Sequence, residues 1–151
     1  MSRRLRVLFL CTGNSARSQL AEVIVRQLSL GRIDVASAGS APQAEIHPMA
    51  RIAAHTVAGA EMDGQYPKLL DRFVDQRFDY VITVCDRAAE SCPTFPGAPQ
   101  RIHWSFEDPA AAHGTEEERQ RAFDLVARGL VARTRLWLSL PDISTAVEAV
   151  P

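Results

Sequence analysis

The segment from Cys11 to Ser18 has the residue types and spacing that best fit a chemical reaction. A cysteine ends a short apolar run, five small or turn-forming residues follow, and the segment closes on Arg17 and Ser18. Successive backbone N–H groups in such a tight loop can bind an anion, and an arginine can offer a planar fork of donors to a tetrahedral oxyanion. We therefore predict Cys11 as a nucleophile beside an oxyanion-binding loop made of Thr12, Gly13, Asn14, Ser15, Ala16, Arg17 and Ser18.

The same loop favours a reactive form of Cys11. A helix N-terminus carries about half a positive charge, and this field together with Arg17 stabilises a thiolate. We therefore expect a lowered pKa for Cys11 and a hydrogen bond from the Ser18 hydroxyl to its sulfur. Gly13 and Asn14 tolerate the left-handed backbone angles that such a loop needs. The alternative is a small buried cysteine at a strand end and a solvated Arg17 on a helix.

Strand and helix patterns alternate along the chain. The continuous apolar character of Leu5–Leu10 is typical of a strand buried on both faces of a parallel sheet. A helix pattern follows the loop directly, with Leu20, Ile24 and Leu28 recurring on one face. The strands that we expect are residues 5–10, 33–38, 78–84 and 101–104.

Capping residues, prolines and glycines mark the predicted helix ends. Gly31 is a natural stop for the first helix. Pro48 fits the first position of a helix that ends before Gly59. Thr115 opens a capping-box pattern at the start of a long helix. The helices that we expect are residues 17–30, 48–58, 67–75, 86–92 and a last one from 115 onward.

These elements predict an α/β fold: a single-domain sandwich with a four-stranded parallel sheet flanked by helices. We assign residues 1–140 to the domain and residues 141–151 to a loose C-terminal tail. In such sheets, ligands bind outside the carboxyl ends of the strands. Cys11, Cys85 and the loop that carries Asp108 each follow a predicted strand. We therefore expect these three side chains to meet at one edge of the sheet.

The bulk properties narrow the range of partners. The chain has 151 residues, 46% of them hydrophobic, and a formal net charge of −1, which is ordinary for one globular domain. This balance gives no case for a nucleic acid or an anionic membrane as a partner, and we expect a monomer. No segment has the length of a membrane span or the pattern of a signal peptide, so we expect a cytoplasmic protein.

The three cysteines, Cys11, Cys85 and Cys92, argue against a structural disulfide framework. Their number is odd and no export signal precedes them, so reduced thiols used in chemistry or buried in the core are expected. The cysteines and the four scattered histidines lack the close-pair spacing of zinc ligands. We therefore expect no metal site.

Residues 11–18 (Cys-Thr-Gly-Asn-Ser-Ala-Arg-Ser) resemble the phosphate-binding loop of the low-molecular-weight protein tyrosine phosphatases and of the arsenate reductases built on that fold. The resemblance extends from the first strand to the last helix and implies their α/β fold. The loop itself is shared by both groups. It therefore implies an oxyanion and a thiolate without choosing between hydrolysis and reduction.

The segment from Cys85 to Pro93 separates the two groups. Two cysteines seven residues apart on a helix lie about 10 Å apart along its axis, whereas a disulfide needs Cα atoms within about 7 Å. The pair can bond only if the segment unwinds, and its Asp and Ser content suggests a low stability. The segment is similar to the redox segment of thioredoxin-coupled arsenate reductases. The alternative is that Cys85 and Cys92 are two unrelated buried thiols.

The resemblance implies a relay of three thiols. Cys11 attacks arsenate held by the loop and Arg17, while Asp108 protonates the departing oxygen as a general acid. Cys85 then attacks Cys11 and releases arsenite. Cys92 attacks Cys85 in turn, and thioredoxin reduces the resulting disulfide. No bound cofactor is implied, because thioredoxin is an external reductant. For Asp108 the alternative is an ordinary capping or turn aspartate.

The residues after Asp108 bear on the substrate. The segment from His103 to Ala110 resembles the reductase form of this loop, and three alanines follow Asp-Pro where phosphatases commonly carry an aromatic pair. This argues against an aryl phosphate. One alternative is a phosphatase that hydrolyses phosphomonoesters through a Cys11 phospho-intermediate. Another is a redox or oxyanion sensor, which would not need Asp108.

Two departures from the relatives concern a cation and a cysteine. Some relatives bind potassium beside the loop, and Asn14, Glu22 and Ser37 match three of its ligands, whereas Lys68 stands in place of an aspartate. We hypothesise that the Lys68 ammonium replaces the cation and orders Asn14. The alternative is a solvated surface lysine. Ala16 stands where some relatives carry a further cysteine outside the relay, so we expect no loss of function there.

Overall fold

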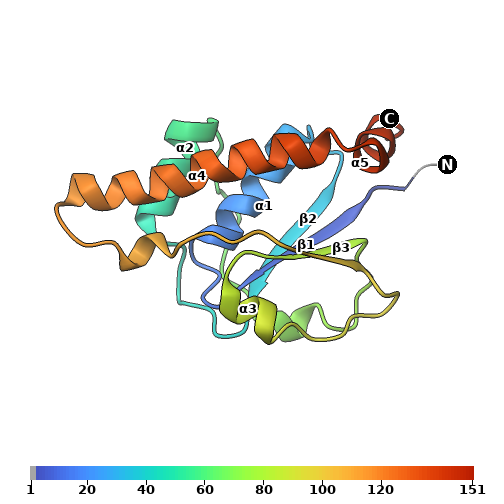
Figure 1. The fold of residues 1–151 in the computed structure, drawn as a ribbon, viewed down its shortest axis with the longest axis horizontal. Coiled ribbons are helices and arrows are strands. Elements are labelled where there is room, and N and C mark those ends of the chain that lie inside the picture. Colours follow the sequence, from blue (N-terminus) through green and yellow to red (C-terminus); the bar gives the residue numbers. More distant parts are fainter. Residues whose placement is uncertain (1–2) are drawn as a thin grey trace.

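Four strands form one parallel sheet in the computed structural model, which describes residues 3–151 (Figure 1). They are β1 (Arg6–Cys11), β2 (Asp34–Gly39), β3 (Tyr80–Thr83) and β4 (Gln100–His103). The order across the sheet is β2-β1-β3-β4, and every pair is parallel. The predicted fold with four parallel strands is therefore confirmed. Residues 1–2, with which the predicted domain begins, lie outside the described residues.

β1 lies inside the sheet because it is apolar on both faces. Leu8 and Phe9 are fully buried, as expected for a parallel strand that is covered on both sides. Leu10 pairs in register with Ala38 of β2 and with Thr83 of β3. The carboxyl ends of these three strands are therefore level, and the segments that follow them leave the sheet at one edge.

Three helices pack together on one side of the sheet, and a short one lies on the other side (Figure 1). The three are α1 (Arg17–Leu28), α2 (Pro48–Ala58) and α4 (Glu116–Leu138), and the short one is α3 (Asp86–Glu90). Their buried residues include Leu20 and Ile24 of α1 and Phe123 of α4, which form the main core with β1. No helix within residues 3–151 has the length and apolar character needed to cross a membrane.

The predicted helix ends are confirmed where capping chemistry is strong. Pro48 is the first residue of α2, and Gly59 ends it with a left-handed φ of 61°. The Thr115 hydroxyl accepts from the backbone N–H of Glu118 at 3.1 Å, and the Glu118 carboxylate accepts from the backbone N–H of Thr115 at 3.3 Å. This reciprocal pair is the expected capping box.

The predicted helix over residues 67–75 is wrong. A single 3-10 turn, η1 (Leu70–Arg72), stands there, and the residues before it are extended. Gly39 forms a parallel bridge with Leu69, and its backbone N–H donates to the carbonyl oxygen of Lys68 at 2.9 Å. Pairing with the end of β2 therefore competes with helix formation and determines the local structure.

The predicted loose tail over residues 141–151 is also wrong. Residues Pro141–Glu148 form α5, and Ile143 in it is only 1% exposed. Val147 packs against the core, and Val150 is buried beyond the helix end. These three apolar residues recur at spacings of four and three, so the tail carries a short amphipathic helix pattern. The folded unit therefore includes this segment.

Candidate active site

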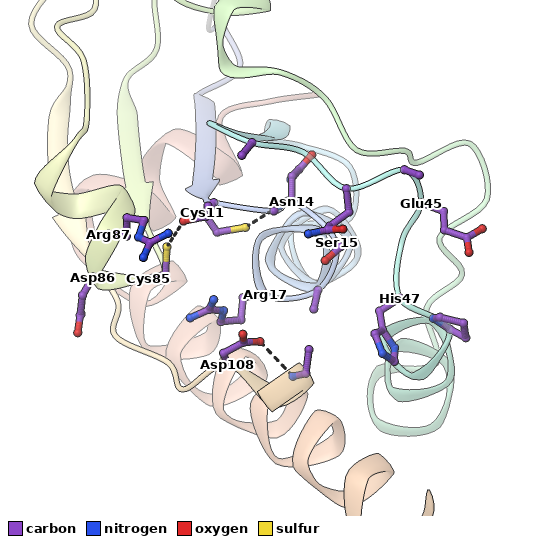
Figure 2. A pocket seen from close by; sticks show the side chains of 18 residues that line it. Cys11, Asn14, Ser15, Arg17, Glu45, His47, Cys85, Asp86, Arg87 and Asp108 are labelled. Atoms are coloured by element: carbon purple, nitrogen blue, oxygen red, sulfur yellow. Dashed lines mark hydrogen bonds between the residues drawn. The ribbon is translucent and has the colours of Figure 1, made fainter. Parts of the chain in front are cut away.

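A cleft of about 910 Å³ opens at the carboxyl edge of the sheet. Figure 2 shows that it brings together four of the predicted residues, Cys11 and Arg17 of the oxyanion loop with Cys85 and Asp108 from two other segments. The lining also includes the predicted loop residues Thr12, Gly13, Asn14, Ser15 and Ala16. Ser18 lies buried behind Cys11, and Cys92 lies outside the lining. The edge of the sheet thus concentrates the candidate chemistry in one place.

The carbonyl oxygens of the loop are already engaged by other parts of the chain. A segment that follows β2 donates backbone N–H groups to three of them. The pairs are Ala41 to Thr12 at 3.0 Å, Gln43 to Gly13 at 2.9 Å and His47 to Ser15 at 2.9 Å. The carbonyl of Asn14 accepts from the Gln19 side chain at 3.1 Å, and that of Ala16 accepts from Leu20 N–H at 2.8 Å. The loop therefore turns its acceptors away from the cleft.

The backbone N–H groups of the loop are available to a ligand. Those of Gly13, Ser15, Ala16 and Arg17 have no acceptor within residues 3–151. Together with the N-terminus of α1, they make a nest of donors for an anion. One guanidinium nitrogen of Arg17 donates to the carbonyl oxygen of Phe106 at 3.0 Å, which fixes the side chain beside the cleft. This arrangement fits the predicted oxyanion site.

Close backbone approach explains one glycine beside this loop. A Cβ on Gly39, the last residue of β2, would lie 2.3 Å from the carbonyl oxygen of Thr12. Within the loop, Asn14 adopts a left-handed φ of 49°, as predicted, whereas Gly13 is not among the positive-φ residues. The Asn14 side chain donates to Ser18 Oγ at 2.7 Å and accepts from the backbone N–H of Lys68 at 2.9 Å.

Cys11 is 4% exposed and lies at the floor of the cleft. Its sulfur lies 2.8 Å from Ser18 Oγ and 3.1 Å from the backbone N–H of Asn14. Burial raises the pKa of the Cys11 thiol above its ordinary value, and the hydrogen bonds from Ser18 and Asn14 oppose this only in part. The predicted lowering of the pKa is therefore wrong, because burial desolvates the sulfur.

Ser18→Ala is expected to raise the pKa of Cys11 further, since it removes a donor to the thiolate. A hydrogen bond to a charged group of this kind corresponds to about a tenfold change in thiolate population. We expect Cys11 to react about tenfold more slowly with iodoacetamide near neutral pH and to need a higher pH for full reactivity. Ser29→Ala, at a buried serine just after α1, is the matched control and should leave the rate unchanged.

The two other cysteines flank α3. Cys85 caps its first turn, where the backbone N–H of Ala88 donates to the sulfur at 3.4 Å. Thr12 Oγ1 lies 3.6 Å from the same sulfur, so the loop that holds Cys11 also contacts Cys85. Cys92 follows the helix and is half-buried, and this burial raises its pKa, with Arg101 opposing the rise. All three thiols are free.

The predicted helix over residues 86–92 is shorter than expected. α3 ends at Glu90, so the two cysteines lie beyond its opposite ends rather than within it. Beyond the end of the helix, the Cys92 thiol donates to the carbonyl oxygen of Pro93 at 3.6 Å. The short helix still separates the two sulfurs along the chain.

Asp108 both caps a turn and faces the cleft. One carboxylate oxygen accepts from the backbone N–H of Ala110 at 3.0 Å, which caps η2 (Pro109–Ala111). Figure 2 shows the carboxylate beside Arg17. Asp108 therefore has the capping role considered as an alternative, and this cap orients its carboxylate toward the oxyanion loop.

Comparison with known proteins then identifies the family. The sequence model of the family low molecular weight phosphotyrosine protein phosphatase matches residues 6–130 of this chain. The chain belongs to this family. Three similar proteins, one compared by sequence and two by structure, are named arsenate reductases. An arsenate reductase from Halalkalibacterium halodurans is 39% identical over 117 residues, which cover 78% of this chain and 83% of the relative.

Two solved structures extend the likeness within the phosphatase family. An arsenate reductase in the phosphate binding state is 26% identical with a TM-score of 0.71, and the match covers 89% of this chain and 97% of that one. A thioredoxin-dependent arsenate reductase from Corynebacterium glutamicum is 29% identical with a TM-score of 0.61. The match covers 90% of this chain and 64% of that one.

Some residues that line the cleft were not predicted as site residues from the sequence. Gln43, Glu45 and His47 line one wall, and Arg87 of α3 lines another. Burial lowers the pKa of His47, and the charge of Arg119 lowers it further, while Asp108 opposes both. The segment from 41 to 48 follows β2, so the rule that places ligands at the carboxyl edge of the sheet could have located it.

Lys68 lies inside the polar network that supports the loop. Its ammonium lies 3.7 Å from Glu22 and donates to the carbonyl oxygen of Tyr66 at 2.7 Å. Ser37 Oγ donates to the same Glu22 oxygen at 2.7 Å. Burial lowers the pKa of Lys68, and the Glu22 carboxylate opposes this. The backbone N–H of Lys68, not its ammonium, holds Asn14, so one part of the hypothesis needs correction.

This network does not fit a bound potassium ion. The oxygens of Glu22 and Ser37 that would hold it are engaged with each other and with the Lys68 ammonium. No cluster of three or more His, Cys, Asp or Glu side chains in the described part of the chain is arranged to hold a metal. The Arg26 guanidinium, 2.7 Å from one Glu22 oxygen, and the Lys68 ammonium, 3.7 Å from the other, supply the positive charge that Glu22 requires.

Lys68→Met is expected to lower the free energy of unfolding by about 1–3 kcal/mol, because it leaves the buried Glu22 carboxylate with less compensation. Urea denaturation measures this change. Arg3→Met, which breaks an exposed pair with Asp79, should have a much smaller effect. Replacing sodium chloride with potassium chloride should not move the unfolding midpoint of the native chain. A stabilisation specific to potassium would contradict our interpretation.

Proposed function

We propose that this chain reduces arsenate to arsenite through a relay of Cys11, Cys85 and Cys92, and that thioredoxin regenerates it. The observation that carries the proposal is the contact between Thr12 Oγ1 and Cys85 Sγ at 3.6 Å, which sets a second free thiol against the oxyanion loop. Hydrolysis of a phosphoester needs a nucleophile, an arginine and an acid, but no second thiol. The similarity to proteins named arsenate reductases supports the same conclusion.

The first step forms a bond between sulfur and arsenic. The N–H nest and Arg17 hold the arsenate oxygens above Cys11, where developing negative charge is stabilised. Cys11 passes its thiol proton to an arsenate oxygen and attacks arsenic as a thiolate, and an arsenic–oxygen bond breaks as the oxygen departs. Asp108 faces this position from η2 and donates a proton, so that the oxygen leaves as water.

The second step reduces arsenic. Cys85 attacks the Cys11 sulfur, and the electron pair of the sulfur–arsenic bond stays on arsenic. Arsenic(V) thereby becomes arsenic(III) and leaves as arsenite, while the two thiols lose two electrons and form the Cys11–Cys85 disulfide. The Thr12 hydroxyl beside Cys85 can stabilise the attacking thiolate.

The third step frees Cys11. Cys92 attacks Cys85, and the displaced Cys11 leaves as a thiolate in the donor-rich loop. The disulfide now joins the residues at the two ends of α3, so the helix must unwind for the sulfurs to meet. Thioredoxin, whose own dithiol supplies two electrons, then reduces the Cys85–Cys92 disulfide at the surface of the protein.

A phosphatase activity is the second candidate, because the N–H nest accepts any tetrahedral oxyanion. The cleft does not favour an aryl phosphate. None of its lining residues in the described chain is Phe, Tyr or Trp, and Ala110 lines it directly after Asp108 and Pro109. We propose weak hydrolysis of small phosphomonoesters as a side activity. We also propose a cytoplasmic monomer with no resident cofactor, in agreement with a reductant delivered by a second protein.

Arsenate-dependent oxidation of NADPH, coupled through thioredoxin and thioredoxin reductase, tests the proposed function. We expect turnover that requires arsenate, thioredoxin and this chain together. Hydrolysis of p-nitrophenyl phosphate, measured in parallel, should be slow. Absence of coupled turnover together with efficient hydrolysis would replace the reductase proposal with a phosphatase.

A further inference from the structure

His103, the last residue of β4, connects the sheet to the first residue of α3. Its Nδ1 lies 2.7 Å from the hydroxyl of Thr83, and its Nε2 lies 3.0 Å from a carboxylate oxygen of Asp86. Asp86 directly follows Cys85 and begins the helix. Both ring nitrogens are therefore used to join the ends of two strands to the segment that carries the second thiol.

The direction of these hydrogen bonds follows from the groups involved. The ionised Asp86 side chain can only accept, so Nε2 of His103 donates to it. In the neutral ring, Nδ1 then accepts from the Thr83 hydroxyl, which fixes the orientation of the imidazole. Thr83 is buried in the sheet, whereas the Asp86 side chain is 82% exposed. The buried Thr83 thus fixes the imidazole of His103, and His103 in turn fixes Asp86 at the start of α3.

α3 has few other attachments. Of its five residues, only Ala88 is buried. Its N-terminal cap is the sulfur of Cys85, which is the atom that the proposed relay turns into part of a disulfide. A weaker contact from Ser105 Oγ reaches the same Asp86 oxygen at 3.5 Å. Apart from the Cys85 cap, the His103–Asp86 hydrogen bond is therefore the main polar attachment of α3 in the thiol form.

We infer that His103 is a positioning residue that holds α3 folded in the thiol form and so sets how readily Cys85 and Cys92 join. The inference rests on the proposed relay. When the two sulfurs bond, two electrons and two protons pass to the oxidant, which is the Cys11–Cys85 disulfide in the relay and oxidised dithiothreitol in the test below, and α3 unwinds. The His103–Asp86 contact is present before this step and lost after it. It stabilises the thiol form and makes the pair a stronger oxidant.

Redox equilibrium of the Cys85–Cys92 pair tests this inference. The pair is isolated in full-length protein with Cys11→Ser and equilibrated in buffers of oxidised and reduced dithiothreitol. His103→Phe removes both ring contacts, whereas His103→Gln keeps a donor that can reach Asp86. We expect His103→Phe to shift the equilibrium constant about fivefold toward the disulfide, since one hydrogen bond to a charged group is lost. His103→Gln should stay within about twofold of the parent.

Two further measurements separate positioning from a general structural effect. His55→Phe removes a different histidine–carboxylate pair, the exposed one with Glu61, and should leave the equilibrium unchanged. A double-mutant cycle of His103→Phe with Asp86→Ala should show coupling that accounts for most of the shift. Amide hydrogen exchange in α3 of the reduced protein should be faster in His103→Phe.

The outcomes distinguish this inference from the proposed function. If the parent protein never forms the Cys85–Cys92 disulfide, the relay is wrong and the role of His103 in it is wrong too. If the disulfide forms equally readily in parent and His103→Phe, the relay stands and the inference is overturned. Faster exchange without a redox shift, or additive effects in the cycle, overturns it as well.

Discussion

Cys92→Ser should release about one equivalent of arsenite per enzyme and then stop, although the wild type turns over continuously with thioredoxin. Cys11 and Cys85 remain able to carry out the first two steps at the cleft. Without the third thiol, the Cys11–Cys85 disulfide has no internal partner to resolve it. The stalled enzyme should therefore accumulate this disulfide, which mass spectrometry of a non-reduced digest detects.

Ser91→Ala is the matched control for Cys92→Ser. It alters the neighbouring position, where the hydroxyl donates to the carbonyl oxygen of Arg87 at 2.9 Å, but it leaves every thiol in place. This variant should keep continuous turnover. Continuous turnover in Cys92→Ser would rule out a three-thiol relay and would favour a small thiol as the direct reductant of Cys85.

Asp108→Asn should lower kcat for arsenate reduction by about 10²- to 10⁴-fold, with a much smaller change in KM. The departing oxygen then leaves without a proton donor. The asparagine oxygen can still accept from the backbone N–H of Ala110, so the η2 cap and the loop geometry are retained. Stopped-flow measurement of arsenite formation in a single turnover would place the loss in the first chemical step.

Glu107→Gln, at the exposed neighbour of Asp108, is the control and should leave kcat within about twofold. A sensor would use the loop and the thiols without needing an acid. If Asp108→Asn has wild-type kinetics, Asp108 is a capping residue alone, and the proton comes from another source.

The oxyanion loop and the sheet could be predicted because both leave strong local signals. Cys11 and Arg17 are separated by small residues between a strand and a helix, and this pattern has few other uses. The level ends of parallel strands then place Cys85 and Asp108 nearby from topology alone. Element types were predicted where apolar periodicity and capping agreed, as in the helix that Thr115 begins.

The errors share a physical origin in contacts distant along the chain. Residues 67–75 form no helix because Leu69 pairs with Gly39 and only the single turn η1 follows, and no local pattern reveals that partner. Burial of Cys11 outweighs its hydrogen bonds in setting the pKa of the thiol, and depth is a property of the whole fold. The contact of His103 with Asp86 joins residues 17 positions apart, and neither of their segments reveals the other as its partner.

Backbone N–H groups from Ala41, Gln43 and His47 hold the loop in shape, although none of these contacts involves a side chain. The oxyanion loop therefore has its shape before a ligand binds, and residues 41–47 determine that shape. Transplanting residues 11–18 into another strand–helix junction would transfer the reactive groups without the segment that holds the loop in shape. A working graft needs residues 41–47 as well, and insertions in that stretch should weaken oxyanion affinity while leaving every reactive side chain unaltered.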